Sequence, residues 1–171
     1  IQPASGDAGG ALGAALAAWH IHYNKDRVVS TSIDAMRGSF IGPEFTDDEI
    51  RLRLDACGAR YHAMTFNNLI GSVTEALVAQ KAIGWMQGRM EFGPRALGGR
   101  SILADPRSPF MQKRLNLKVK YRESFRPFAP SILRECVDDW FEHDADSPYM
   151  LLVADLKKDK RLVMTASQKS L

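Results

Sequence analysis

The hydrophobic and polar positions along the chain predict helices that alternate with short strands. Helices are predicted where apolar residues recur every three or four positions, and strands where short apolar runs lie between turn residues. The predicted helices span residues 11–22, 46–57, 70–80, 109–117 and 137–143, and the predicted strands span 59–65, 82–86 and 149–156. This alternation is typical of an α/β or α+β layered domain.

Two of these helices carry signals at their ends. Thr46 precedes Glu49 by three residues, which is the capping-box pattern, and Gly58 is placed to end the same helix. Ser108 is a candidate N-cap residue for the helix predicted to begin at Pro109.

The first 24 residues differ from the rest of the chain. A Gly-rich turn leads into an alanine-rich, uncharged helix pattern, which is typical of a helix buried against a larger body. The chain begins without Met or a signal-peptide pattern, so we expect an internal segment of a longer protein. Residues 1–24 are then the end of an upstream domain, 25–44 a linker, and 45–171 a second domain cut short at its C-terminus.

Composition excludes some classes of protein. No apolar run approaches the roughly 18 to 20 residues that a membrane span needs, so no membrane partner is expected. Cys57 and Cys136 lack the spacing of metal ligands, and the four histidines form no metal-binding motif. Two free thiols are typical of a protein in the reducing cytoplasm, which is the predicted location.

The net charge of +3 is unevenly distributed along the chain. Residues 89–126 hold ten Lys or Arg and three acidic residues, for a net charge of +7, so the remainder carries −4. A basic segment within a mildly acidic protein indicates a local site for phosphate or another anion, and nucleic acid is not an expected partner.

The sequence GRMEFGPRALGGR at 88–100 is the first candidate site. Arg89, Arg95 and Arg100 lie among four glycines and a proline, so the backbone can approach a ligand closely. Guanidinium groups suit phosphate or carboxylate, and Glu91 is predicted to orient one of them. The alternative is a solvated surface loop with a few ion pairs.

The second candidate is KVKYRESFRPF at 118–128, where basic residues alternate with aromatic ones. Such a stretch can bind a nucleotide through phosphate pairing and ring stacking. The alternative is a basic edge followed by a core strand that buries Phe125 and Phe128. If the strands pair, this stretch and Arg95 form two walls of one pocket.

Asp7 precedes the first predicted helix and is the third candidate. From spacing alone it is an N-cap, although a carboxylate there could also bind a metal ion.

Three segments together resemble a known family: GRMEFGPRALGGRSILADPR (88–107), KVKYRESFRPFAPSIL (118–133) and SPYMLLV (147–153). They are similar to the carbamoyltransferases of nodulation and antibiotic tailoring, the NodU and TobZ type, and the likeness covers roughly 45–156. It implies that 45–171 is a YrdC-like domain, a twisted open mixed sheet with flanking helices. It also implies that 1–24 is the end of an actin-like, ATPase-fold domain.

The resemblance implies a chemistry as well. In this family ATP and carbamoyl phosphate form carbamoyl adenylate in the YrdC-like domain, and the actin-like domain transfers the carbamoyl group to a hydroxyl of a small-molecule acceptor. A divalent metal, Fe or Mg/Mn, assists that transfer in the full-length enzyme. The implied catalytic residues are Arg95, Lys120 and Arg126, the implied substrate- and nucleotide-binding residues are Arg89, Arg100, Arg122, Ser131, Gly9 and Gly10, and the implied metal ligand is Asp7.

The sequence departs from the family in two respects. The histidine ligands of the metal are missing, and so is a THVD-like motif with a further Arg after the last segment. We therefore expect this chain to bind nucleotide or carbamoyl phosphate weakly and not to turn over. Two alternatives remain open at this stage: a nucleic-acid-binding YrdC-like module without catalysis, and a docking domain for an acidic partner.

Overall fold

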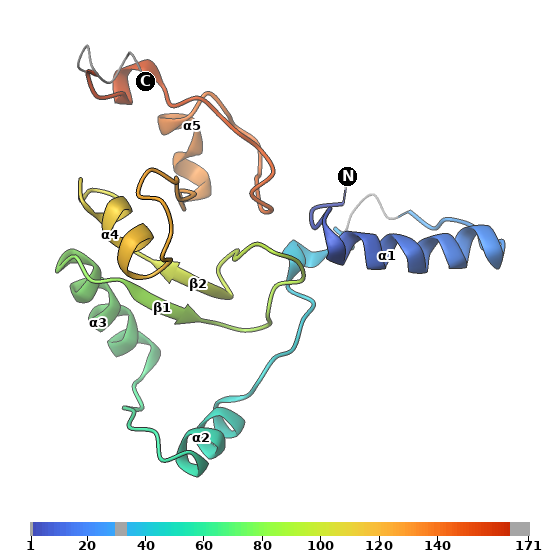
Figure 1. Cartoon of the computed structure of the whole chain (residues 1–171), viewed down its shortest axis with the longest axis horizontal. Coiled ribbons are helices and arrows are strands. Elements are labelled where there is room, and N and C mark those ends of the chain that lie inside the picture. Colours follow the sequence, from blue (N-terminus) through green and yellow to red (C-terminus); the bar gives the residue numbers. More distant parts are fainter. Residues whose placement is uncertain (1, 30–33, 165–171) are drawn as a thin grey trace. The chain divides into compact units, whose positions relative to one another are not determined.

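A computed structural model describes residues 2–29 and 34–164 of the chain. The chain divides into two compact units, residues 1–128 and 129–171. The first unit contains α1 (Asp7–Ala17), a π-helical turn (Ala18–His22), a 3₁₀ turn (Arg37–Ser39), α2 (Asp47–Ala56), α3 (Phe66–Val78), β1 (Ile83–Met86), β2 (Arg100–Leu103) and α4 (Met111–Lys118) (Figure 1). This combination of helices with an antiparallel sheet confirms the predicted α+β class.

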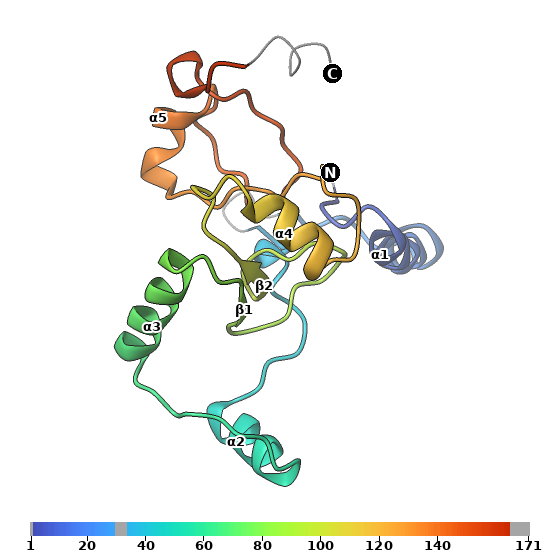
Figure 2. The ribbon, with the colours of Figure 1, turned by 60° about the vertical axis from the view of Figure 1, so that its left-hand side comes forward.

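The strands β1 and β2 form a two-stranded antiparallel sheet, which Figure 2 shows from a second direction. Ile83 pairs with Leu103 at one end of the sheet, and Met86 pairs with Arg100 at the other. The strand predicted over 82–86 is confirmed, whereas β2 was not predicted because its four residues carry no alternating pattern. A larger YrdC-like twisted open sheet stays a prediction.

The helix α2 shows how closely local sequence determines local structure. The amide of Glu49 donates to the Thr46 hydroxyl (3.3 Å), and the amide of Thr46 donates to the Glu49 carboxylate (2.8 Å). This reciprocal pair confirms the predicted capping box, and the backbone hydrogen bond from Thr46 lowers the pKa of Glu49. Gly58 follows the helix with a φ of +66°, as predicted for its end.

Three predictions about individual elements are wrong. Residues 59–65 and 149–156 form no strand, and Val153 is 101% exposed. An apolar run favours burial, but a strand also needs a hydrogen-bonding neighbour, and the second run has only the isolated bridge between Phe141 and Leu156. Ser108 does not cap α4, because a turn intervenes and Phe110 occupies the N-cap position without a side-chain hydrogen bond.

The second unit contains short elements: a 3₁₀ turn (Arg134–Cys136), α5 (Val137–Trp140) and a further 3₁₀ turn (Lys158–Lys160). The helix predicted over 137–143 is therefore present as a single turn. The amide of Glu142 donates to the carbonyl of Asp155, and the amide of Lys157 to that of Trp140, each at 2.8 Å. These two hydrogen bonds join residues 140–142 to residues 155–157.

No helix in the described parts of the chain has both the length and the apolar character needed to cross a membrane.

In the first unit, the turn before α1 contacts the loop between β1 and β2. Ala4 is 2% exposed, and its carbonyl oxygen lies only 2.2 Å from where a Cβ on Gly9 would stand. On its other side, the Cβ of Ala4 lies 2.6 Å from the position of a Cβ on Gly93, whose φ is +108°. Both glycines are therefore required by this close approach. By contrast, α1 itself has no buried residue.

The adjacent glycines of α1 provide a matched test of this packing. We expect Gly9→Ala to lower the free energy of unfolding by about 1–3 kcal/mol, because its methyl group overlaps the carbonyl of Ala4. Gly10 has no atom within 4 Å of its Cβ position, so Gly10→Ala should raise stability by about 0.5–1 kcal/mol. Chemical denaturation of both variants measures the difference, and equal effects would contradict the contact.

Candidate anion-binding site

The segment 87–100, here called the Arg–Gly loop, connects β1 to β2 and is hydrogen bonded to residues 39–43. The amide of Phe92 donates to the carbonyl of Ser39 (2.7 Å), and the amide of Gly42 donates to that of Met90 (3.0 Å). The amide of Met90 donates in turn to the carbonyl of Pro43 (2.9 Å). Part of the stretch predicted as a linker is thus a backbone partner of the candidate site.

Glu91 fixes the conformation of the Arg–Gly loop. Its Oε1 accepts hydrogen bonds from the amides of Leu97 (2.7 Å), Gly99 (2.7 Å) and Arg100 (3.2 Å). The structure thus pairs Glu91 with backbone amides, whereas the sequence suggested an arginine side chain as its partner. Burial raises the pKa of this carboxyl, but the backbone hydrogen bonds together outweigh that effect and lower it.

Two of the three arginines of this loop contact the protein itself. Arg100 Nη1 donates to the carbonyl oxygens of Gly99 (2.7 Å) and Gly88 (3.1 Å). Arg89 Nη1 donates to the carbonyl of Gly42 (2.9 Å), and its Nε lies 3.6 Å from a carboxylate oxygen of Glu44. Both side chains therefore hold backbone in place, and their predicted role in ligand binding stays a prediction.

Arg95 differs from these two arginines. Its side chain is exposed, and it has no hydrogen bond or ion pair to any other described residue. Residues on both sides of Arg95 in the sequence, together with the ring of Phe40, line an open pocket of about 360 Å³. The residues that line this pocket are Phe40, Gln87, Gly88, Arg89, Leu97, Gly98 and Gly99.

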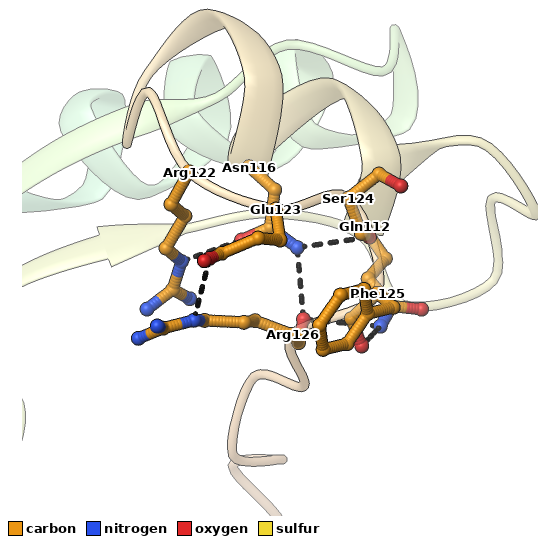
Figure 3. A network of polar contacts seen from close by, with 7 residues as sticks. All are labelled: Gln112, Asn116, Arg122, Glu123, Ser124, Phe125 and Arg126. Carbon is orange, nitrogen blue, oxygen red and sulfur yellow. Dashed lines mark hydrogen bonds and ion pairs between the residues drawn. The ribbon is translucent and has the colours of Figure 1, made fainter.

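The segment 119–128, here called the basic loop, folds back over α4 through the polar network drawn in Figure 3. Asn116 of α4 is completely buried, and its Nδ2 donates to the carbonyls of Ser124 (3.1 Å) and Arg126 (2.8 Å). Gln112, one turn earlier, donates to the carbonyls of Phe125 (3.1 Å) and Arg126 (3.0 Å). Two amide side chains thus satisfy backbone that belongs to no helix or strand.

The charged side chains of the basic loop lie close to one another. Arg122 Nε donates to Asn116 Oδ1 (2.7 Å), and its guanidinium group stacks over the ring of Phe128 at 4.9 Å. Arg126 Nε lies 2.8 Å from a carboxylate oxygen of Glu123. A backbone hydrogen bond, followed by the charge of Arg126 and more weakly that of Arg122, lowers the pKa of Glu123.

The alternative for the basic loop was a basic edge followed by a core strand that buries Phe125 and Phe128, and the structure contradicts part of it. It is not a strand, and Phe125 is 77% exposed, so that ring is not part of a core. The side chain of Lys120 is exposed and has no hydrogen bond or ion pair to another described residue, although the backbone amide of Lys120 donates to the carbonyl of Leu115 (2.9 Å). Ser131 is likewise exposed and belongs to the second unit. One pocket shared by Arg95 and the basic loop stays a prediction.

Asp7 is the first residue of α1, whose N-cap is Gly6 without a side-chain hydrogen bond. The N-cap role expected from spacing is therefore wrong. A carboxylate in the first turn still stabilises the helix, because it interacts favourably with the helix dipole. The described residues contain no group of three or more His, Cys, Asp or Glu side chains able to hold a metal ion. The role of Asp7 as a metal ligand therefore stays a prediction.

Two buried polar residues, Asn116 and Asp105, were not predicted from the sequence. Asn116 lies beside Leu115 on the face of α4 that is buried, so a polar residue among apolar ones was the available signal. Asp105 is also buried and accepts hydrogen bonds from the amide (2.9 Å) and the guanidinium group (2.7 Å) of Arg107. The side chain of Arg107 remains 74% exposed, and its hydrogen bond to Asp105, followed by that of the Arg107 amide, lowers the pKa of Asp105.

Comparison with known proteins agrees with the resemblance seen in the sequence. The family described as Carbamoyltransferase C-terminus matches residues 74–169. The uncharacterized protein sll1178 of Synechocystis is 55% identical over 100% of this chain and 28% of its own length. Nodulation protein NolNO of Sinorhizobium fredii is 38% identical over 97% of this chain and 24% of its own length. A 3'-hydroxymethylcephem-O-carbamoyltransferase of Streptomyces clavuligerus is 33% identical over 93% of this chain and 28% of its own length.

The chain therefore belongs to the carbamoyltransferase family, and its residues 74–169 correspond to the C-terminal region of that family. It spans about a quarter of the length of the curated relatives it matches. Both the Arg–Gly loop and the basic loop lie within the matched region.

The hydrogen bonds to Glu91 predict a pH dependence. Because its folded-state pKa lies below the ordinary value of 4.5, the carboxylate stabilises the fold above that pH, and the effect is lost as the pH falls through the lowered pKa. Glu91→Gln keeps an oxygen acceptor without the charge. It should therefore be less stable at neutral pH and lose less stability on acidification.

Thermal unfolding of both proteins from about pH 7 to 3 tests this expectation. Glu135→Gln serves as the control, since the Glu135 side chain is exposed and makes no hydrogen bond or ion pair with another described residue. It should retain the wild-type profile. A wild-type acid response in Glu91→Gln would rule out the proposed role of the carboxylate.

Proposed function

We propose that this chain is the substrate-activating part of an ATP-dependent O-carbamoyltransferase. In this proposal it binds ATP and carbamoyl phosphate. Hydrolysis of carbamoyl phosphate releases phosphate and leaves carbamate, whose oxygen attacks the α-phosphorus of ATP and displaces pyrophosphate, which gives carbamoyl adenylate for transfer to a hydroxyl group of an acceptor. The supporting observation is the division of labour among the cations. Arg89 and Arg100 bond the backbone, whereas the exposed side chains of Arg95 and Lys120, in the same matched region, have no ion pair or hydrogen bond with any residue in the described parts of the chain.

Electrostatics gives a reason for this arrangement. ATP and carbamoyl phosphate are both multiply charged anions, so bringing them together costs repulsion that nearby cations must offset. Phosphoryl chemistry of this kind needs little covalent participation by the protein and depends on positioning and charge stabilisation. Arg122 and Arg126 would bind phosphate oxygens through the guanidinium nitrogens that face away from their internal partners, while the exposed Tyr121 and Phe125 rings offer faces for a base.

The acceptor belongs to the proposal as well. One relative carries a hydroxymethyl acceptor in its name, which supports a hydroxyl group as the site of transfer. This chain spans about a quarter of the length of its curated relatives. We therefore expect it to bind the donor anions without completing the transfer.

The unpaired cations provide the test of the proposed function. We expect Arg95→Ala and Lys120→Ala each to weaken ATP binding by roughly tenfold or more, because each removes a charge-assisted hydrogen bond worth about 1.5–3 kcal/mol. Titration calorimetry with ATP, and separately with carbamoyl phosphate, measures the effect.

Lys113→Ala is the matched control, since this lysine is an exposed cation of α4 outside both loops. It should bind ATP as the wild type does. An equal loss in Lys113→Ala would indicate general charge attraction in place of a defined site. Binding of long RNA that ATP does not compete away would instead favour the nucleic-acid-binding alternative.

A further inference from the structure

The basic loop contains one feature that anion binding alone does not explain. Asn116 is polar, carries no charge and has no exposed surface. A buried amide is costly unless its donors and acceptor all have partners. Here each has one, and every partner lies in the basic loop.

The two ends of the Asn116 amide perform different tasks. Its NH₂ group donates to the carbonyls of Ser124 and Arg126, which fixes the path of the backbone that carries Arg126. Its carbonyl oxygen accepts from Nε of Arg122, which fixes the plane of that guanidinium group. The backbone amide of Arg122 also donates to the backbone carbonyl of Asn116 (3.0 Å), so Asn116 bonds both the backbone and the side chain of Arg122.

Both guanidinium groups consequently use Nε for an internal contact, a hydrogen bond in Arg122 and an ion pair in Arg126. Arg122 Nε is bonded to Asn116, and Arg126 Nε is bonded to Glu123. Their terminal nitrogens lie at the same end of the network in Figure 3, with the Glu123 carboxylate beside them. Terminal guanidinium nitrogens are the donors that bind phosphate in a two-pronged manner, so orienting them in advance lowers the entropy cost of binding.

We infer that Asn116 is a positioning residue for an anion site formed by Arg122 and Arg126, and that it acts by holding Arg122 Nε and the Arg126 backbone. This inference rests on the proposed function, because it assigns the anion of ATP or a related phosphate to these two arginines. Asn116 touches no ligand itself. Its effect on binding is transmitted entirely through the arginines.

The test is a double-mutant cycle in the whole chain with ATP as the probe. Asn116→Ala removes the acceptor of Arg122 Nε, and Arg122→Lys keeps the positive charge while removing the Nε donor. Each should weaken ATP binding by about tenfold, and the loss in the double variant should be smaller than the product of the two single losses, because the contact between Asn116 and Arg122 Nε is absent from both single variants. Losses that multiply would overturn the inference, since independent effects add in free energy.

A spectroscopic readout separates positioning from general destabilisation. The Nε–H resonance of Arg122 in ¹⁵N NMR should exchange slowly in the wild type but fast in Asn116→Ala, which lacks the oxygen acceptor. If Asn116→Ala does not fold, the wild-type exchange rate and Arg122→Lys still decide the question. Wild-type ATP affinity in Arg122→Lys, or fast exchange of the Arg122 Nε–H in the wild type, would refute the assigned role.

Gln112→Ala provides the matched control in the same helix. Gln112 is exposed and bonds the carbonyls of Phe125 and Arg126, but it does not touch the Arg122 side chain. The Arg122 Nε–H signal should survive in this variant. If the wild-type chain binds no ATP, the proposed function fails and the inference fails with it. If the wild type binds and Asn116→Ala binds equally well, the inference alone fails.

Discussion

The local structure of the matched region depends on satisfying backbone polar groups where no sheet is present to do so. Its sheet has two short strands, and the described residues that are both apolar and buried are few: Ala4, Met111 and Leu115. The long loops must therefore find hydrogen-bond partners among side chains. Glu91 serves the amides of the Arg–Gly loop, Arg100 serves its carbonyls, and Asn116 serves the carbonyls of the basic loop.

This requirement separates two kinds of basic residue that look alike in the sequence. Arg89, Arg100 and Arg107 each bind a carbonyl or carboxylate of the protein, so their charge is used to hold the chain. Arg95 and Lys120 have no such partner among the described residues. Arg122 and Arg126 are intermediate, because one nitrogen of each is used internally while the other nitrogens remain available to a ligand.

Local signals in the sequence predicted the parts of the fold that depend on neighbours in the chain. The capping box at Thr46 and the helix stop at Gly58 were predictable because their partners lie within a few residues. The apolar run at 149–156 misled because burial and strand pairing depend on distant segments. For the same reason the arginines of the Arg–Gly loop were identifiable as a group, whereas their separate roles were not, since Arg89 bonds Gly42, 47 residues away.

The hydrogen bonds that Glu91 accepts have a consequence for how the proposed anion site would select a ligand. A glycine-rich loop commonly presents backbone amides to phosphate, and these amides recognise shape as well as charge. Here three of them face a carboxylate of the protein itself. Recognition then depends on long, flexible cationic side chains, which follow the number of charges on a ligand more closely than its outline. Ligands that share a phosphate but differ in size would then bind to these side chains with similar affinity.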